Sequence, residues 1–292
     1  MQIAKEKIYE EAAKQLPYEK ILIVCKRGTI DAKAYMTNRD FNYMLKERNL
    51  NEIELRDSYD AVFHLVTSAS GAEEYFLVDD PLRDGLIEEA KRIDEQIINA
   101  WTGHKHFRVI DNRSTFQNKM KQLIKEISIF LDEEGPYETQ KKFLIKKPDI
   151  DYLNRLNNCN KVKVIEIFLN SDKNHITNLI QRGINSNYTY SKITKNKDKN
   201  VETEIRLTQD LYIDELTNID TTKKVIIKDR YCITIKSIYY EIDIYEHLKD
   251  YAICEVELTK EEELNLPKFI EVVEDITSKE EYTDHYFAKT VN

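Results

Sequence analysis

Charged residues spaced two apart recur between positions 224 and 258 of this 292-residue chain. In a β-strand, residues i and i+2 point to the same side, so each pair lies on one face. Lysine and arginine bind phosphate oxygens, and carboxylates bind hard divalent cations such as magnesium. A face that carries both kinds of residue could therefore hold a polyanion together with its metal ion. The pairs are Lys228 and Arg230, Glu241 and Asp243, and Glu255 and Glu257.

The segments that carry these pairs predict consecutive antiparallel strands with one charged side and one apolar side. In the last segment, Ala252, Cys254, Val256 and Leu258 alternate with the glutamates. This pattern has two interpretations. An antiparallel sheet with one solvent-exposed face is common. A closed barrel would instead turn its charged side inward, where opposite charges satisfy one another.

Similar alternation occurs elsewhere between residues 136 and 292. At least seven segments of this region predict strands that carry charge on one side. A triphosphate needs cations from several directions, and a hydrolysing site also needs carboxylates for its metal. The additional polar and charged positions are Glu138, Gln140 and Lys142 in PYETQKKFLI, Arg182 before Gly183, Lys192 after NYTY, and Glu202, Glu204 and Arg206 in VETEIRL.

The N-terminal part has a different pattern. Residues 21–25, 61–66 and 107–110 are apolar runs typical of strands buried on both faces. Apolar stripes at helical spacing predict helices over 1–16, 86–101 and 116–130. This alternation favours an α/β layer with a parallel sheet. The acidic turn DEEGP then marks a boundary at Gly135, which predicts domains 1–135 and 136–292.

Composition excludes several classes of protein. The net charge of −9 argues against general DNA or RNA binding, which favours a basic surface. No apolar run approaches the roughly 20 residues that span a bilayer, and no signal peptide opens the chain. The cysteines are far apart, which is typical of reduced cysteines in a cytoplasmic protein. All six glycines are isolated, so neither a P-loop nor a dinucleotide fingerprint is present.

The phrases ILIVCKRGTIDAKAYM, YDAVFHLVTSASGAEEYF and AWTGHKHFRVIDN resemble the AAA-like P-loop ATPase domain that is fused to a CYTH domain in some proteins. Arg27, Gly28 and Asp31 match that family. Lys26 replaces the aspartate that would hold magnesium, and Gly85 follows Arg83 where a glutamate is expected. The family's P-loop would precede the first helix, where this sequence starts. We therefore expect no ATP hydrolysis by this half. The missing strand would leave sheet edges exposed, which predicts either a rearranged N-terminal half or a homodimer contact there.

Residues 137–288 resemble the CYTH, or triphosphate tunnel, superfamily, through ETQKKFLI, IKDR, EIDIY, CEVEL and YTDHYFA in that order. The resemblance implies an antiparallel barrel of about eight strands with flanking helices, which makes the whole chain α+β. It also implies a triphosphate-bearing substrate and Mg²⁺ or Mn²⁺. The implied metal-binding and catalytic acids are Glu138, Glu255 and Glu257; the implied phosphate contacts are Lys142, Arg182, Lys192, Lys228 and Arg230; Glu202, Glu204, Glu241 and Asp243 are supporting acids.

Several family positions differ. Gln140 replaces the second glutamate of the opening motif, and Asn178 and Ile180 stand where arginines are expected. Each lost charge-assisted contact weakens phosphate binding by about 1.5–3 kcal/mol. Three hypotheses follow. The first is a barrel that binds, and in its catalytic form slowly hydrolyses, inorganic, nucleoside or thiamine triphosphate. The second is a non-catalytic sensor of a nucleotide or phosphoinositide headgroup, and the third is a decayed structural remnant.

Overall fold

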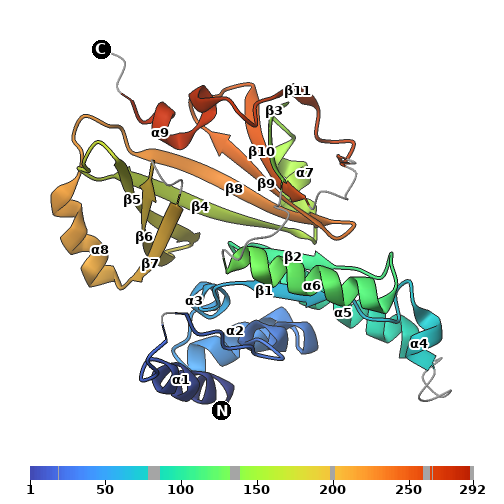
Figure 1. Cartoon of the computed structure of the whole chain (residues 1–292). Coiled ribbons are helices and arrows are strands. Elements are labelled where there is room, and N and C mark those ends of the chain that lie inside the picture. The colour runs from blue at the N-terminus through green and yellow to red at the C-terminus, as the bar shows by residue number, and fades with distance from the viewer. Residues whose placement is uncertain are drawn as a thin grey trace.

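The computed structural model describes residues 1–18, 20–77, 86–131, 139–197, 201–258, 264 and 266–289. A large antiparallel sheet forms one side of the molecule, and the N-terminal helices lie against it (Figure 1). The overall class is therefore α+β, as predicted. The predicted boundary at Gly135 falls outside the described residues.

The N-terminal half alternates helices with short strands. Strands β1 and β2 pair in parallel, with Val62 opposite Phe107. The predicted elements at 1–16, 61–66, 86–101, 107–110 and 116–130 are confirmed within a few residues at their ends. The elements are α1 (Gln2–Ala13), the 3-10 helix η1 (Thr29–Tyr35), α2 (Asn38–Glu47), α3 (Glu52–Asp57), β1 (Val62–Leu65), α4 (Glu73–Leu77), α5 (Ile87–Trp101), β2 (Phe107–Ile110) and α6 (Phe116–Phe130).

Local signals explain where these helices begin. Thr37 and Thr115 cap α2 and α6 by accepting hydrogen bonds from backbone amides of the first turn. Helix α5 buries Ile97, Ala100 and Trp101 on one face, where they pack against η1 and β2. The apolar stripe predicted from the sequence is therefore the face that holds this half together.

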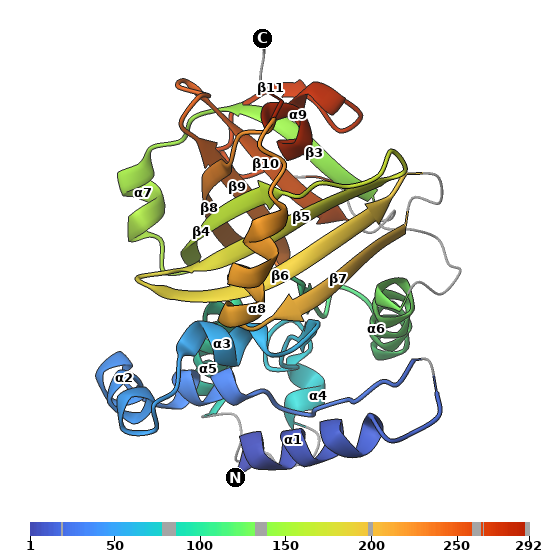
Figure 2. The same ribbon diagram turned by 90° about the vertical axis from the view of Figure 1, so that its left-hand side faces the viewer.

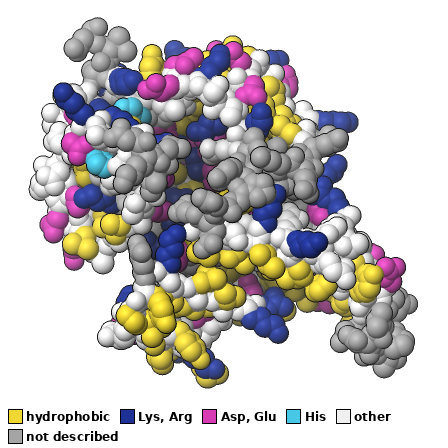
Figure 3. All heavy atoms as spheres, in the orientation of Figure 1, with side chains coloured by type: hydrophobic (Ala, Val, Ile, Leu, Met, Phe, Trp, Pro, Cys, Tyr) yellow, Lys and Arg dark blue, Asp and Glu magenta, His cyan; other side chains and the backbone are white. Residues whose placement is uncertain are grey.

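The prediction of a buried strand at residues 21–25 is wrong. Four consecutive residues of this run are exposed: Ile21 by 39%, Leu22 by 52%, Ile23 by 43% and Val24 by 76%. A buried strand needs a neighbouring strand on each side, and within the described part of the chain this sheet contains β1 and β2 alone. Figure 3 shows hydrophobic side chains gathered on the N-terminal half.

The described residues of the C-terminal half form nine antiparallel strands in the order β11-β3-β10-β9-β8-β4-β5-β6-β7. Figure 2 shows β5, β6 and β7 curling over the N-terminal half. The strands are β3 (Thr139–Lys146), β4 (Cys159–Phe168), β5 (His175–Ile184), β6 (Asn187–Asn196), β7 (Val201–Leu207), β8 (Ile226–Ile235), β9 (Ile238–Tyr245), β10 (Tyr251–Leu258) and β11 (Val272–Asp275). The connecting elements are α7 (Ile150–Arg155), α8 (Gln209–Glu215), η3 (Leu216–Asn218), η4 (Glu280–Tyr282) and α9 (Asp284–Phe287).

The expected closed barrel is not formed by the described residues. Strands β11 and β7 are the two ends of the strand order, and no described pairing joins them. The sheet nevertheless has the predicted apolar face. Ala252, Cys254 and Val256 are fully buried beneath Leu153 of α7 and Ile270. This face fixes the register of the strands and thereby directs the alternate residues to the opposite, charged face.

No helix within the described residues has the length and apolarity needed to cross a membrane.

Candidate phosphate-binding site

The charged face of the sheet contains a row of side chains that crosses adjacent strands. Lys142 of β3 lies opposite Glu255 of β10, which lies opposite Glu241 of β9. Lys142 forms an ion pair with Glu255 and keeps a quarter of its side chain exposed, at 25%. Burial raises the pKa of Glu241, and the adjacent charge of Glu255 raises it further. Two carboxylates thus lie side by side, and a cation is needed to hold both ionised.

Arg230 and Lys228 of β8 form the basic side of the site. Arg230 binds Asp243 with two bonds of 2.7 Å each and also pairs with Glu241. The Lys228 ammonium lies 2.8 Å from Asp243. Burial alone would raise the pKa of Asp243, but the two cations outweigh it and hold the pKa well below its usual range. The predicted pairing of bases and acids across these strands is therefore present.

Helix α9 adds a further carboxylate to the basic side. Asp284 accepts a hydrogen bond of 2.7 Å from Lys228 and another of 2.7 Å from the Tyr245 hydroxyl. Glu166 of β4 lies beside Asp284 and accepts a bond of 2.7 Å from the amide of Asn178. Lys228 therefore lies among acids that come from different parts of the chain.

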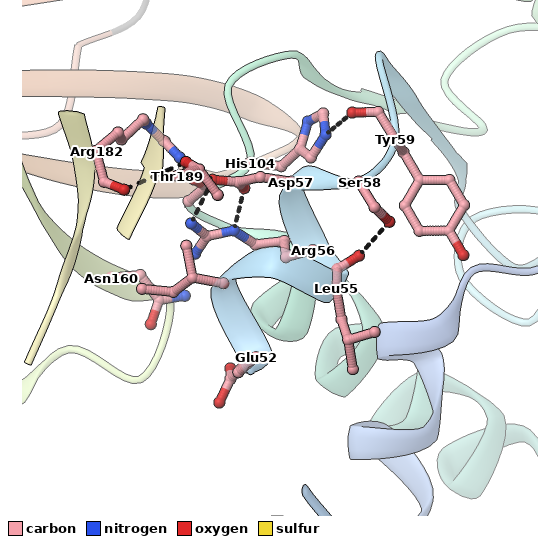
Figure 4. A network of polar contacts seen from close by, with 12 residues as sticks. Glu52, Leu55, Arg56, Asp57, Ser58, Tyr59, His104, Asn160, Arg182 and Thr189 are labelled. Atoms are coloured by element: carbon pink, nitrogen blue, oxygen red, sulfur yellow. Dashed lines mark hydrogen bonds and ion pairs between the residues drawn. The ribbon is translucent and has the colours of Figure 1, made fainter. Parts of the chain in front are cut away.

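Arg182 of β5 is on the same face, but it is bound to the N-terminal half (Figure 4). Its guanidinium lies 2.8 Å from Asp57 at the end of α3 and also donates to the carbonyl of Gly103. Arg56 binds the same carboxylate at 2.8 Å. Burial would raise the pKa of Asp57, but the two arginines outweigh it and hold that pKa far below its usual range. The sequence predicts Arg182 as a phosphate contact, but in the structure its guanidinium is already bound to Asp57.

The remaining predicted residues are not all brought to this face. Lys192 lies on the opposite face and donates a bond of 2.7 Å to Glu215 of α8. Glu202 and Glu204 are on the edge strand β7, where Glu204 accepts from Lys105 at 2.7 Å. Glu138 lies outside the described residues, as do Arg83 and Gly85. Glu257 occupies the β10 position opposite Gln140.

The charged face opens onto a cavity of about 3510 Å³ that is also lined by N-terminal residues. This volume is several times that of a small-molecule pocket, about 300–1,000 Å³. Gln140, Lys228, Arg230, Glu241 and Glu255 all line it. A phosphate-bearing molecule could therefore reach the row of bases and acids from solvent.

The donor set for a metal ion is incomplete within the described residues. No group of three or more His, Cys, Asp or Glu side chains there is arranged to hold a metal ion. Glu241 and Glu255 are adjacent, but protein cations already neutralise them. The family resemblance implies three metal-binding carboxylates, which are Glu138, Glu255 and Glu257. No chemical step through a metal is therefore derived from this geometry.

Sequence reasoning did not assign Glu166, Asp284 or Asp57 to the site. Glu166 lies two residues from Val164, which pairs with Lys228, so its position on the charged face follows from period-2 spacing once the strand is known. Asp284 and Asp57 come from short helices far away in sequence, and no local pattern indicates their contacts with Lys228 and Arg182.

Two N-terminal residues that the AAA-like resemblance singles out, Lys26 and Asp31, can be located in the structure. Lys26, at the expected magnesium position, lies in an exposed bend. Asp31 accepts a hydrogen bond of 2.6 Å from the Trp101 indole and so anchors η1 to α5. A carboxylate used in this way supports packing rather than ion binding.

Comparison with known proteins matches parts of the chain. A family model described as an AAA domain matches residues 1–119. No protein of curated function matches the chain. Among solved structures, the inorganic triphosphatase NE1496 covers 53% of this chain and 96% of its own, at 20% identity and a TM-score of 0.39. A putative adenylate cyclase from Vibrio parahaemolyticus covers 44% of this chain and 80% of its own, at 13% identity and a TM-score of 0.30. At these scores the structural likeness supports no conclusion about function. Any such conclusion has to rest on the residues of the charged face.

Proposed function

We propose that the charged face binds a small molecule that carries a triphosphate, and slowly hydrolyses it in the presence of Mg²⁺ or Mn²⁺. The observation that carries the proposal is the grouping of Lys142, Lys228 and Arg230 on one face of the sheet, where Lys228 and Arg230 line the cavity. Lys142 is the most exposed of these cations and would make the first contact with phosphate. Arg230 offers the planar donors that suit phosphate oxygens.

The charge balance supports a requirement for an added cation. The bases Lys142, Lys228 and Arg230 supply three positive charges, and Glu241, Asp243, Glu255 and Asp284 supply four negative charges when ionised. A triphosphate adds several more negative charges to this group. A divalent ion bound with the substrate would compensate for them, since it takes oxygen ligands from carboxylate and phosphate together.

The test is phosphate release from inorganic triphosphate, ATP and thiamine triphosphate, with magnesium, with manganese and with chelator. We expect slow turnover that requires the ion and is lost in the double variant Glu255→Gln, Glu257→Gln. Lys142→Gln should weaken triphosphate binding at least tenfold, because one charge-assisted contact contributes about 1.5–3 kcal/mol. Lys146→Gln on the same strand is the matched control, since Lys146 is exposed and pairs with Glu271. Equal binding by both lysine variants would contradict the proposal.

A second candidate function is a non-catalytic sensor of nucleotides or phosphoinositide headgroups. The specific observation in its favour is that Arg182, Lys228 and Arg230 already have carboxylate partners. Gln140, in place of a glutamate, also weakens the metal side. The sensor predicts thermal stabilisation by the same ligands, with no phosphate release and no dependence on the metal.

A further inference from the structure

Two carboxyl groups meet where β4, β8 and α9 converge on the charged face. Glu166 is only 8% exposed, and Asn178 donates to one of its oxygens at 2.7 Å. Asp284 lies within hydrogen-bonding reach of Glu166. Both residues line the same cavity as Lys228 and Arg230. The pair therefore belongs to the site and not to the packed interior.

The partners of the two carboxyls differ. Asp284 receives hydrogen bonds from Lys228 and Tyr245, which favour its ionised form. The hydrogen-bonding neighbours of Glu166 are a neutral amide and a carboxylate. Burial raises the pKa of Glu166 to about 8, and the charge of Asp284 adds to the shift. Asp284 of α9 and Lys228 of β8 are the charged groups that act on Glu166 directly. Asp243 and Tyr245 of β9 and Arg230 of β8 act on Lys228, and His285 of α9 contacts Phe168, two residues along β4.

A proton on Glu166 changes what this end of the site offers to an anion. The neutral carboxyl donates its one hydrogen to Asp284 and adds no negative charge to a group that already contains Asp243 and Asp284. The ionised carboxyl only accepts, and it repels phosphate. Binding of a polyanion beside Lys228 should therefore favour the protonated form.

We propose that Glu166 and Asp284 share a proton, and that this proton makes Glu166 a specificity-determining residue for phosphate binding at neutral pH. This inference rests on the proposed function of the charged face. It is chemically separate from the metal requirement, because no described contact joins Glu166 to Glu255, the implied metal ligand whose side chain the structure describes. Loss of the proton in mild alkali would weaken triphosphate binding through this residue.

The experiment is calorimetric titration of inorganic triphosphate into wild-type protein and Glu166→Gln, between pH 6.5 and pH 9. Glutamine keeps the shape and the hydrogen-bond donor but cannot ionise. We expect equal affinities at pH 6.5 and about tenfold weaker binding by the wild type at pH 9, one unit above the pKa of about 8. Comparing variants at each pH cancels the titration of the ligand itself.

Glu202→Gln is the matched control. Glu202 lines the same cavity from β7 and is exposed, so its replacement should change affinity by one constant factor across this pH range. Infrared difference spectra provide a readout that needs no ligand. A protonated carboxyl band should be present in the wild type at pH 6.5, be lost by pH 9, and be missing in Glu166→Gln. Parallel affinity curves for wild type and Glu166→Gln, or absence of that band, would overturn the inference alone. Absence of binding by every variant at every pH would overturn the proposed function with it.

Discussion

Arg182 and Lys228 lie on the same face of the sheet, on strands separated by β4, and each is neutralised by a carboxylate from outside the sheet. At Arg182 the carboxylate is Asp57 of α3, which a second arginine also binds. At Lys228 it is Asp284 of α9, which has another carboxyl, Glu166, beside it. The first arrangement has more cations than acids, and the second has more acids than cations.

This difference separates a structural contact from an adjustable one. The two arginines hold the pKa of Asp57 far below its usual range, so its bond with Arg182 is a fixed connection between the halves at neutral pH. The group around Lys228 can gain or lose a proton near neutral pH, and it can therefore respond to an anionic ligand. The same type of ion pair thus has different consequences because of one neighbouring residue.

The largest effect is expected from breaking the Arg182 contact. Asp57→Ala would leave two buried guanidinium groups without their carboxylate, which typically costs about 3–5 kcal/mol of unfolding free energy. Urea denaturation would measure the loss. Asp60→Ala is the control, because Asp60 pairs with Arg206 at the surface and should contribute less than about 1 kcal/mol. Similar losses in the two variants would show that the Asp57 contact is not structural.

A smaller effect is expected from pH at the Lys228 end. The pKa of Glu166 is raised to about 8 in the folded protein, so the folded state holds its proton more tightly than the unfolded state does. The fold should therefore lose stability on the order of 1 kcal/mol per pH unit between about pH 5 and pH 8 through this residue. Glu166→Gln should lack that loss in urea denaturation curves taken across this range. Identical slopes in the two proteins would contradict the assignment of the proton.

The smallest effect is expected at the edge of the interface between the halves. Lys105 donates to Glu204 across this edge, and both side chains are about one-third exposed, at 30% and 33%. Glu204→Ala should change stability by less than about 1 kcal/mol, and added salt should reduce the change further. A loss comparable to that of Asp57→Ala would mean that the edge, and not Arg182, holds the halves together.

Much of the sheet was predictable because period-2 alternation depends only on local geometry. Lys228 with Arg230 and Glu241 with Asp243 fall on one face, as their spacing predicted. Lys192 was placed on the wrong side because β6 carries polar residues on both faces, so alternation there does not say which face is charged. The closed barrel expected from the family resemblance was also not found among the described residues.

The other differences come from contacts between distant segments. The run at residues 21–25 has the composition of a buried strand, but burial depends on a neighbouring strand and not on composition. The contact of Arg182 with Asp57 joins residues 125 positions apart, and no local signal encodes it. The candidate site was therefore predictable strand by strand, whereas its neutralising partners from α3 and α9 were not.

Polar contacts between the halves also bear on how the chain folds. Asn160 donates to the carbonyls of Asn99 and Thr102, and Tyr239 binds the backbone of Gly103. These groups are buried or partly buried where the halves meet, so separating the halves would remove their partners in both. The sequence pattern changes at an acidic turn, but the contacts between the halves mean that neither half has its full stability without the other. The two halves should acquire their stability together, in one cooperative step.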